Sequence, residues 1–226
     1  MAFASPHYGF ERRPAWDALP RHRHRAGYLA LILEGSYEEA GDRGRLRVEP
    51  GDMLVHGAFD AHLNRFPASG ARILNLALPD GAEPKAGVMR PADTDLAIRL
   101  AERDPDAAAR LLIDGATPVR IAPLDWPDQL AADLTQDPTL RIGDWAAAHG
   151  LANATVSRGF RQLYGTSPNA FRAQQRGRLA WERIVQGDPP LADLAFALGF
   201  ADQAHMTRTV QAITGAAPTI WRMQVK

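Results

Sequence analysis

Residues 144–165 read DWAAAHGLANATVSRGFRQLYG, and residues 191–215 read LADLAFALGFADQAHMTRTVQAITG. Each stretch has a short apolar segment, a glycine, and a longer segment whose apolar residues recur every three or four positions. This pattern predicts two helices joined by a tight turn. Such a helix-turn-helix unit places its second helix in the major groove of DNA. Two units on one chain predict an all-helical C-terminal domain that binds double-stranded DNA.

In the first unit, Gly150 is expected to form the turn and Asn153 to cap the second helix. Val156 and Phe160 are spaced to face the core, which leaves the polar side chains of this helix for DNA. Arginine can bond bidentately to guanine. The alternative is an ordinary helical hairpin with a solvated arginine face. The residues predicted to contact DNA are Asn153, Ala154, Thr155, Ser157, Arg158 and Arg161.

In the second unit, Gly199 is expected to form the turn and Phe200 to pack into the core behind it. A helix over about 168–186 is predicted to connect the units, because Ser167 can cap it and Pro168 suits its first turn. Glutamine suits adenine, and arginine suits guanine or phosphate. For the histidine, a surface position without a groove role is an equal alternative. The predicted contacts are Gln203, His205, Thr207 and Arg208.

Residues 138–222 resemble the DNA-binding domain of the AraC/XylS family of bacterial transcriptional regulators. The resemblance covers about ninety residues, in order and with the family's spacing, and it implies a transcriptional regulator that acts on promoter DNA. A second chain would double the reading units along DNA and could bring the regulator and RNA polymerase together. The matching residues are Gly165-Thr166-Ser167-Pro168, the run Ala195 to Phe200, Ala201-Asp202-Gln203, Arg208, Gly215, and Pro218 with Trp221-Arg222.

The chain departs from the family pattern at several positions. Ala152 stands where the first reading helix usually begins with serine, Gly159 lies inside that helix, and Gly177 follows Arg176 where the family has leucine. Phosphate contacts supply much of the affinity for DNA. We therefore expect the second unit to bind DNA weakly and the first to carry more of the specificity. In the second unit, Met206, Val210 and Thr214 replace aromatics, and Gln211, Ala212 and Ile213 replace a basic cluster.

Composition narrows the class of protein. The 226 residues suffice for two modest domains. The region from Pro138 onward has ten Lys and Arg against five Asp and Glu, whereas residues 1–120 have sixteen against seventeen. The absence of cysteine excludes disulfides and thiol chemistry. No stretch has the length and apolarity of a signal peptide or membrane span, so a cytoplasmic protein without a membrane partner is expected.

The N-terminal half has the pattern of short strands. Segments 28–37, 45–56 and 72–78 are apolar or alternating and are separated by turns, which indicates an antiparallel barrel or sandwich. Residues 93–113 predict a helical hairpin whose second helix begins at Pro105, either packed as an ordinary hairpin or used for dimerisation. The predicted class is α+β. Its expected segments are a barrel at 1–85, a helical hairpin and linker at 90–125, and a double helix-turn-helix domain at 126–226.

Residues 20–66 resemble the small cupin barrel that serves this family as its effector-binding domain. The resemblance depends on His22-Arg23-His24, on Leu33-Glu34-Gly35, and on Pro50-Gly51-Asp52 leading to His62. It implies that the three imidazoles meet, as they do around the metal ion of cupin enzymes.

The histidines allow two interpretations. His22 and His24 point to the same side of a strand, and with His62 they suit a divalent transition metal. The carboxylate that cupins place four residues after the second histidine is absent, since Tyr28 stands there; His56 can substitute if its strand face is the inner one. The alternative is that His22 and His24 line an organic-ligand pocket or lie at a barrel rim among Arg21, Arg23 and Arg25. These arginines could neutralise an anionic effector. The predicted pocket residues are His22, His24, Tyr28, His56, His62 and Phe66.

Together these observations predict a homodimeric transcriptional regulator whose barrel senses a small molecule. No catalytic residue is expected. Two rival hypotheses are a DNA-binding regulator with a purely structural barrel and a metal-dependent cupin enzyme.

Overall fold

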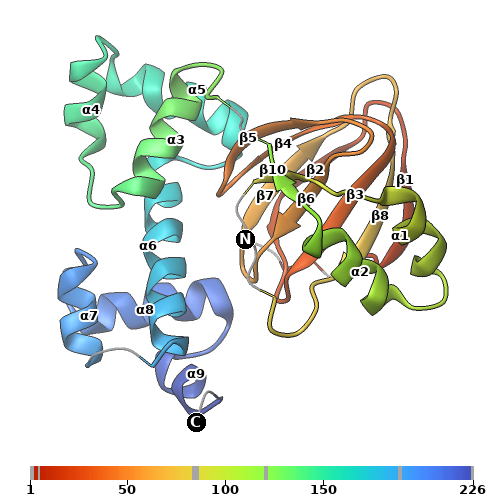
Figure 1. Cartoon of the computed structure of the whole chain (residues 1–226). Coiled ribbons are helices and arrows are strands. Elements are labelled where there is room, and N and C mark those ends of the chain that lie inside the picture. The colour runs from red at the N-terminus through yellow and green to blue at the C-terminus, as the bar shows by residue number, and fades with distance from the viewer. Residues whose placement is uncertain (1–2, 5, 83–86, 120–121, 188–189, 225–226) are drawn as a thin grey trace. The chain divides into compact units, whose positions relative to one another are not determined.

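The computed structural model describes residues 3–4, 6–82, 87–119, 122–187 and 190–224. The chain divides into two compact units, Met1–Pro123 and Leu124–Lys226, each of which is described by itself (Figure 1). The turn predicted at 187–190 lies partly outside the described residues, as does part of the loop predicted between 78 and 88. Among the described helices, none has both the length and the apolarity that crossing a membrane requires.

The N-terminal unit contains two antiparallel sheets, which confirms the predicted strand-rich half. Pro50 and Gly51, with φ of +90° at the glycine, break the segment predicted at 45–56 into two strands. One sheet has the order β1 (Gly9–Arg13), β8 (Ala71–Ala77), β3 (Tyr28–Gly35), β6 (Met53–His56), β9 (Val88–Arg90), β10 (Thr117–Pro118). The other has the order β2 (Ala18–Arg23), β7 (Ala61–Arg65), β4 (Tyr37–Gly41), β5 (Gly44–Val48).

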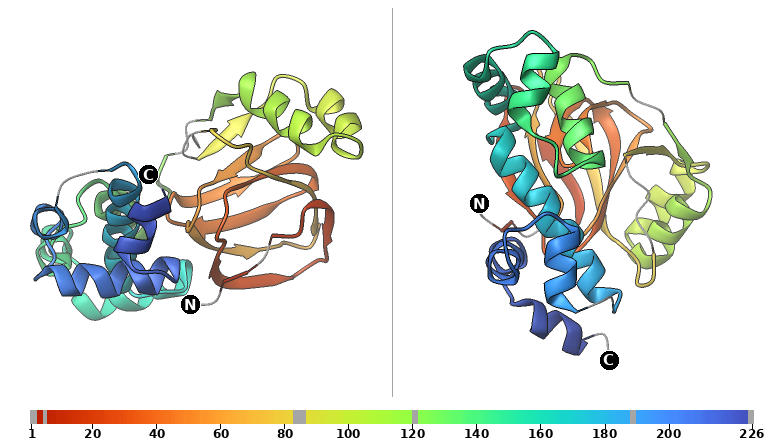
Figure 2. Two further views of the ribbon diagram at one scale, coloured as in Figure 1. Left: turned by 90° about the horizontal axis from the view of Figure 1, so that it is seen from below. Right: turned by 90° about the vertical axis from the view of Figure 1, so that its left-hand side faces the viewer.

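Both faces of the larger sheet are buried. Successive side chains of a strand point to opposite faces. On β3, Tyr28 and Ala30 join the core between the sheets, and Leu29 and Leu31 join a second core on the outer face. The helices α1 (Thr94–Ala101) and α2 (Pro105–Asp114) cover that outer face (Figure 2). The apolar run of β3 is therefore explained by burial on both sides.

The predicted hairpin and its capping are confirmed. The Asp104 side chain accepts a hydrogen bond from the Ala107 N–H, and Pro105 occupies the first turn of α2. Ala108 and Leu112 are fully buried against the sheet, whereas Leu96 on α1 is 38% exposed. The hairpin thus packs against the strands, inside the compact unit that ends at Pro123.

The C-terminal unit contains only helices among its described residues. Around the long α6, Phe160, Tyr164 and Phe171 are fully buried and form one aromatic cluster. The Ser167 hydroxyl caps α6 and Pro168 occupies its first turn, as predicted. The helices are α3 (Trp126–Gln136), α4 (Ile142–Ala148), α5 (Asn153–Tyr164), α6 (Pro168–Val185), α7 (Leu191–Ala197), α8 (Gln203–Thr214) and α9 (Pro218–Gln224) (Figure 1).

Two glycines that depart from the family pattern allow helices to approach closely. A Cβ at Gly159 would lie 2.6 Å from Cζ2 of Trp126 on α3. A Cβ at Gly177 would lie 2.2 Å from Cδ1 of Ile213 on α8. Glycine inside a helix costs about 1 kcal/mol relative to alanine. Here that cost is offset by packing that a larger residue would prevent.

A candidate DNA interface and a histidine-lined cavity

The first helix-turn-helix unit comprises α4, a turn at Gly150 and α5. Gly150 has φ of +65°, which confirms its predicted left-handed turn. Val156 and Phe160 are fully buried, so the apolar face of α5 is the predicted one. The predicted capping by Asn153 is wrong, because extended Ala152 is the N-cap and Asn153 already begins the helix. The side chains exposed on α5 include all the predicted DNA contacts: Asn153, Ala154, Thr155, Ser157, Arg158 and Arg161.

The second unit comprises α7, a turn at Gly199 with φ of +68°, and α8. Phe200 is buried, as expected. Asp202 caps α8 by accepting a hydrogen bond from the His205 N–H at 2.6 Å. Gln203 and Arg208 are exposed. Two predicted contacts, His205 and Thr207, are half-buried, and the His205 ring lies edge-on to Phe200.

The connecting helix α6 holds both units through two arginines. Arg172 donates to the carbonyl oxygen of Leu140, just before α4, at 2.8 Å. Arg176 donates to the carbonyl oxygen of Gly199, in the turn of the second unit, at 2.6 Å, and its guanidinium lies 5.0 Å from the Phe200 ring centroid. Burial lowers the pKa of Arg176. Two arginines one turn apart on α6 therefore contact the segment before α4 and the turn before α8.

Replacing Arg176 with alanine should destabilise the second helix-turn-helix unit. A charge-assisted hydrogen bond contributes about 1.5–3 kcal/mol when buried, and Arg176 is partly exposed, so we expect the free energy of unfolding to fall by about 1 kcal/mol. Chemical unfolding followed by tryptophan fluorescence measures it. Arg176→Lys is the control and should be destabilised less than Arg176→Ala, since lysine keeps the charge but lacks the planar guanidinium. Unchanged stability in both variants would contradict the assigned role.

A cavity of about 280 Å³ opens inside the N-terminal unit, between its sheets. Its wall includes five of the six predicted pocket residues, His22, His24, Tyr28, His62 and Phe66. His56 is buried behind Tyr28, with the two rings stacked at 4.3 Å. Sequence reasoning missed several polar lining residues from strands distant in sequence, among them Glu11, Arg13, Asn64 and Asn75.

The arginines predicted to neutralise an effector are engaged elsewhere. Arg21 pairs with Asp42 at 2.5 Å, and Arg25 lies over the ring of Phe3. Arg23 is buried, and burial lowers its pKa. None of the three is among the described residues that line the cavity; Arg13, which pairs with Glu11 at 2.5 Å, supplies the positive charge there.

Strand register brings the histidines together. His22 on β2 lies opposite His62 on β7, and Gly41 on β4 flanks His62 from the other side. A Cβ at Gly41 would lie 2.9 Å from Cβ of His62, so glycine leaves room for the imidazole. The ring centroids of His22 and His24 are 4.9 Å apart, and those of His22 and His62 4.5 Å. One nitrogen from each of these three histidines lies within 4.8 Å of the others.

Backbone carbonyls orient two of these rings. His22 Nδ1 lies 2.8 Å from the Pro20 oxygen, and His24 Nδ1 lies 2.9 Å from the Ala4 oxygen. A carbonyl only accepts, so each Nδ1 carries the proton and each Nε2 presents a lone pair. Burial lowers the pKa of His22, and it lowers that of His24 to about 4. These imidazoles are therefore neutral at neutral pH.

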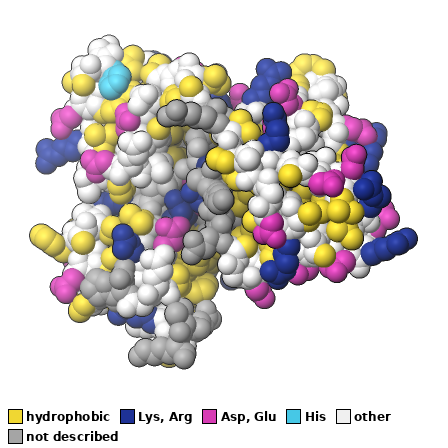
Figure 3. All heavy atoms as spheres, viewed as in Figure 1, with side chains coloured by type: hydrophobic (Ala, Val, Ile, Leu, Met, Phe, Trp, Pro, Cys, Tyr) yellow, Lys and Arg dark blue, Asp and Glu magenta, His cyan; other side chains and the backbone are white. Residues whose placement is uncertain are grey.

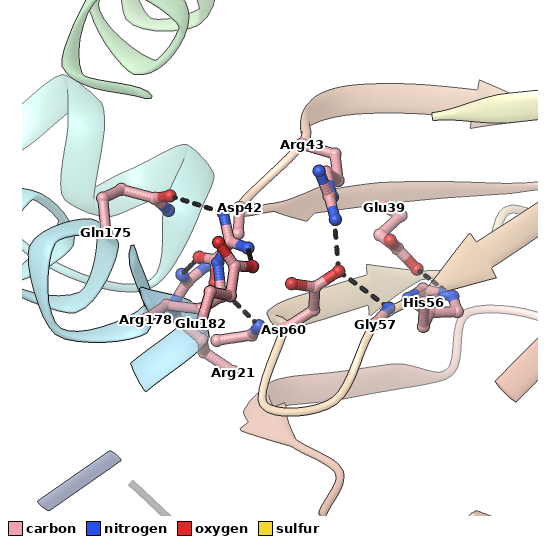
Figure 4. A network of polar contacts seen from close by, with 11 residues as sticks. Arg21, Glu39, Asp42, Arg43, His56, Gly57, Asp60, Gln175, Arg178 and Glu182 are labelled. Atoms are coloured by element: carbon pink, nitrogen blue, oxygen red, sulfur yellow. Dashed lines mark hydrogen bonds and ion pairs between the residues drawn. The ribbon is translucent and has the colours of Figure 1, made fainter. Parts of the chain in front are cut away.

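The structure answers the open question about His56 and adds a carboxylate. Tyr28 lies opposite His56 in the β3–β6 pair, and both are buried, so the side chain of His56 points inward. Glu39 on β4 lies with its Oε2 3.6 Å from His56 Nε2 (Figure 4). Burial raises the pKa of Glu39 to about 8 and lowers that of His56 to about 3. Glu39 was not predicted from the sequence because it lies seventeen residues from His56, and no local pattern connects the two positions.

The loop between β6 and β7 fixes the two strands that carry His56 and His62. The Asp60 carboxylate accepts hydrogen bonds from the Gly57 N–H at 2.9 Å and from Arg43 Nε at 3.3 Å (Figure 4). Asp42 accepts from the Ala61 N–H at 3.0 Å. These bonds stabilise the chain reversal between the two strands.

Comparison with known proteins finds relatives of the C-terminal unit. Residues 145–224 match a family model described as a helix-turn-helix domain. The chain is 25% identical over 79 residues to the HTH-type transcriptional regulator ExsA of Pseudomonas aeruginosa, covering 35% of this chain and 28% of ExsA. It is 24% identical over 123 residues to a putative AraC-like transcription regulator of Streptomyces antibioticus, covering 54% and 38%. The chain thus spans about a third of the length of these relatives.

Among solved structures, the chain aligns over most of its length with ToxT from Vibrio cholerae. The TM-score is 0.44 at 10% identity, with 95% of this chain and 98% of that chain covered.

Proposed function

Starting from the AraC-type helix-turn-helix domain of this chain, we propose that the protein is a transcriptional regulator that binds promoter DNA through α5 and α8 and a small molecule through the cavity of its barrel. The observation that carries the proposal is the pairing of two reading helices, each preceded by a left-handed glycine and each presenting polar side chains to solvent.

The two helices are proposed to contribute unequally. α5 exposes Arg158 and Arg161, whereas Arg208 is the single arginine of α8. In the place of a basic cluster, Gln211 and Ala212 are uncharged and Ile213 is buried against α6. Because cationic side chains supply the phosphate contacts that dominate affinity, α5 is the principal reader.

The test of DNA recognition is the selection of binding sequences from a pool of random duplexes by the full chain. We expect enrichment of a short sequence for α5 and a weaker preference about one helical turn away for α8. A chain that retains all duplexes equally, at every salt concentration, would contradict sequence-specific binding.

The cavity suits a small effector with both polar and apolar groups. Its wall combines imidazoles and amides with Leu19, Phe66 and Ile73. Its volume of about 280 Å³ lies just below the range of about 300–1,000 Å³ that is usual for ligand sites, which favours a small effector. Screening a metabolite panel by thermal shift should identify compounds that raise the melting temperature, because a ligand selective for the native state stabilises it.

The same screen, followed by DNA-binding measurements with each hit, separates the proposal from its rivals. A purely structural barrel predicts that no compound changes the affinity for DNA. A metal-dependent cupin enzyme predicts turnover of a bound compound, lost when His22 or His62 is replaced.

We also propose that the protein acts as a homodimer and contacts RNA polymerase at the promoter. The outer side of the α1–α2 hairpin is the dimerisation candidate, because Leu96 is exposed there and hydrophobic side chains gather among charged ones over these helices (Figure 3). Analytical ultracentrifugation of the full chain and of Leu96→Lys tests the dimer: a monomeric wild-type chain would exclude it.

A further inference from the structure

Glu39 and His56 are buried side by side without a hydrogen bond between them. His56 Nε2 and Glu39 Oε2 are 3.6 Å apart, which is too far for a hydrogen bond. Both side chains are about 95% buried, and His56 Nε2 has no hydrogen-bond partner among the described residues. An unpaired buried polar atom costs about 1–3 kcal/mol, so such atoms are uncommon in folded proteins.

The distance fits two ligands of one metal ion. Ligand atoms about 2.1 Å from an ion, at a tetrahedral angle, lie about 3.4 Å from each other. His62 supplies a third donor: one ligand atom each from Glu39, His56 and His62 lies within 4.8 Å of the others. His62 Nδ1 is also buried without a partner among the described residues.

We infer that the barrel binds one divalent transition-metal ion through Glu39, His56 and His62, in the wall behind the cavity. Two imidazoles and one carboxylate favour iron, zinc or manganese over magnesium or calcium, which prefer oxygen ligands throughout. The carboxylate also offsets part of the charge of the ion.

This donor set differs from the one that the sequence motif predicts. His22 and His24 share His62 with it, but they line the cavity and offer no carboxylate. Glu39 thus supplies from β4 the acid that is missing at Tyr28. Its Oε2 accepts a hydrogen bond from Asn64 Nδ2 at 3.2 Å, which is the kind of contact that orients a ligating carboxylate.

A metal ion here would connect to the effector cavity through two side chains. His62 and Tyr28 line the cavity, and the Tyr28 hydroxyl lies 3.3 Å from His62 Nε2. The ring of Tyr28 also stacks on His56. The ion would therefore fix the side chains that form this end of the cavity, while His22 and His24 remain free to contact the effector.

Titration of the chelator-treated full chain with Zn²⁺, followed by calorimetry, tests the inference. We expect one ion per chain, and at least a tenfold weaker affinity in Glu39→Gln and in His56→Gln. The matched control is His24→Gln, which removes a histidine of the other set from the same barrel and should leave the affinity within about threefold of the wild type. Circular dichroism of each metal-free variant establishes that it folds.

Three outcomes would overturn the assignment. The wild type could fail to bind Zn²⁺ or Co²⁺; His24→Gln could lose as much affinity as Glu39→Gln, which would place the ion on the three-histidine set; or the affinity of Glu39→Gln could equal that of the wild type. As a second readout, the visible spectrum of bound Co²⁺ should change in Glu39→Gln. None of these outcomes bears on DNA binding by the C-terminal unit, so they are separable from failure of the proposed function.

Discussion

Gly177→Leu, which installs the residue that the AraC/XylS pattern has at this position, is expected to destabilise the C-terminal unit by about 2 kcal/mol. Overpacking of a well-filled core costs about 3 kcal/mol at its upper range, and replacing a helical glycine gives back about 1 kcal/mol. The steric cost exceeds the gain because the added Cβ would lie 2.2 Å from Ile213 Cδ1 and 2.8 Å from Thr209 Cγ2.

Urea unfolding followed by tryptophan fluorescence measures this loss, since Trp126, Trp145, Trp181 and Trp221 all lie in the C-terminal unit. Gly143→Ala is the matched control: it also replaces a helical glycine, but nothing lies within 4 Å of the added Cβ, so stability should not fall. Ile213→Ala should rescue Gly177→Leu by making room for it, which a double-mutant cycle would register. Wild-type stability of Gly177→Leu would contradict close packing of α6 against α8.

Arg158→Ala should weaken binding to the selected DNA sequence by about 10–100-fold and binding to random DNA much less. A bidentate contact between arginine and guanine contributes about 1–3 kcal/mol of discrimination against other bases. Arg158 is exposed in the first half of α5 and has no ion pair among the described residues, so it is available to a base edge. Fluorescence anisotropy with both duplexes at one salt concentration measures the two affinities.

The control for this prediction is Arg208→Ala on α8, an arginine of similar exposure in the second unit. We expect a smaller loss there, because α8 is proposed to support rather than lead recognition. Equal losses of Arg158→Ala on selected and random DNA would identify Arg158 as a phosphate contact. A larger effect from Arg208 would reverse the assigned order of the two helices.

The local features of this fold could be predicted because their signals are contained in short stretches of chain. Asp104-Pro105 and Ser167-Pro168 begin helices by capping chemistry that involves only neighbouring residues. The three- and four-residue spacing of Val156 and Phe160 defined the buried face of α5. Asn153 was misplaced by one position because capping preference does not fix where the helical dihedral angles begin.

The sequence by itself determined that a strand-rich half precedes a helical one, that the helical half holds two helix-turn-helix units, and that His22, His24 and His62 meet. Only the tertiary structure showed that Glu39 faces His56 and that His56 lies on the inner face of β6. It also showed that Gly159 and Gly177 leave room for the side chains of Trp126 and Ile213. The physical reason is the range of the interactions. Periodicity and capping act over a few residues, whereas strand register and helix contact join positions far apart, and no local pattern encodes which side chain will fill the space opposite another.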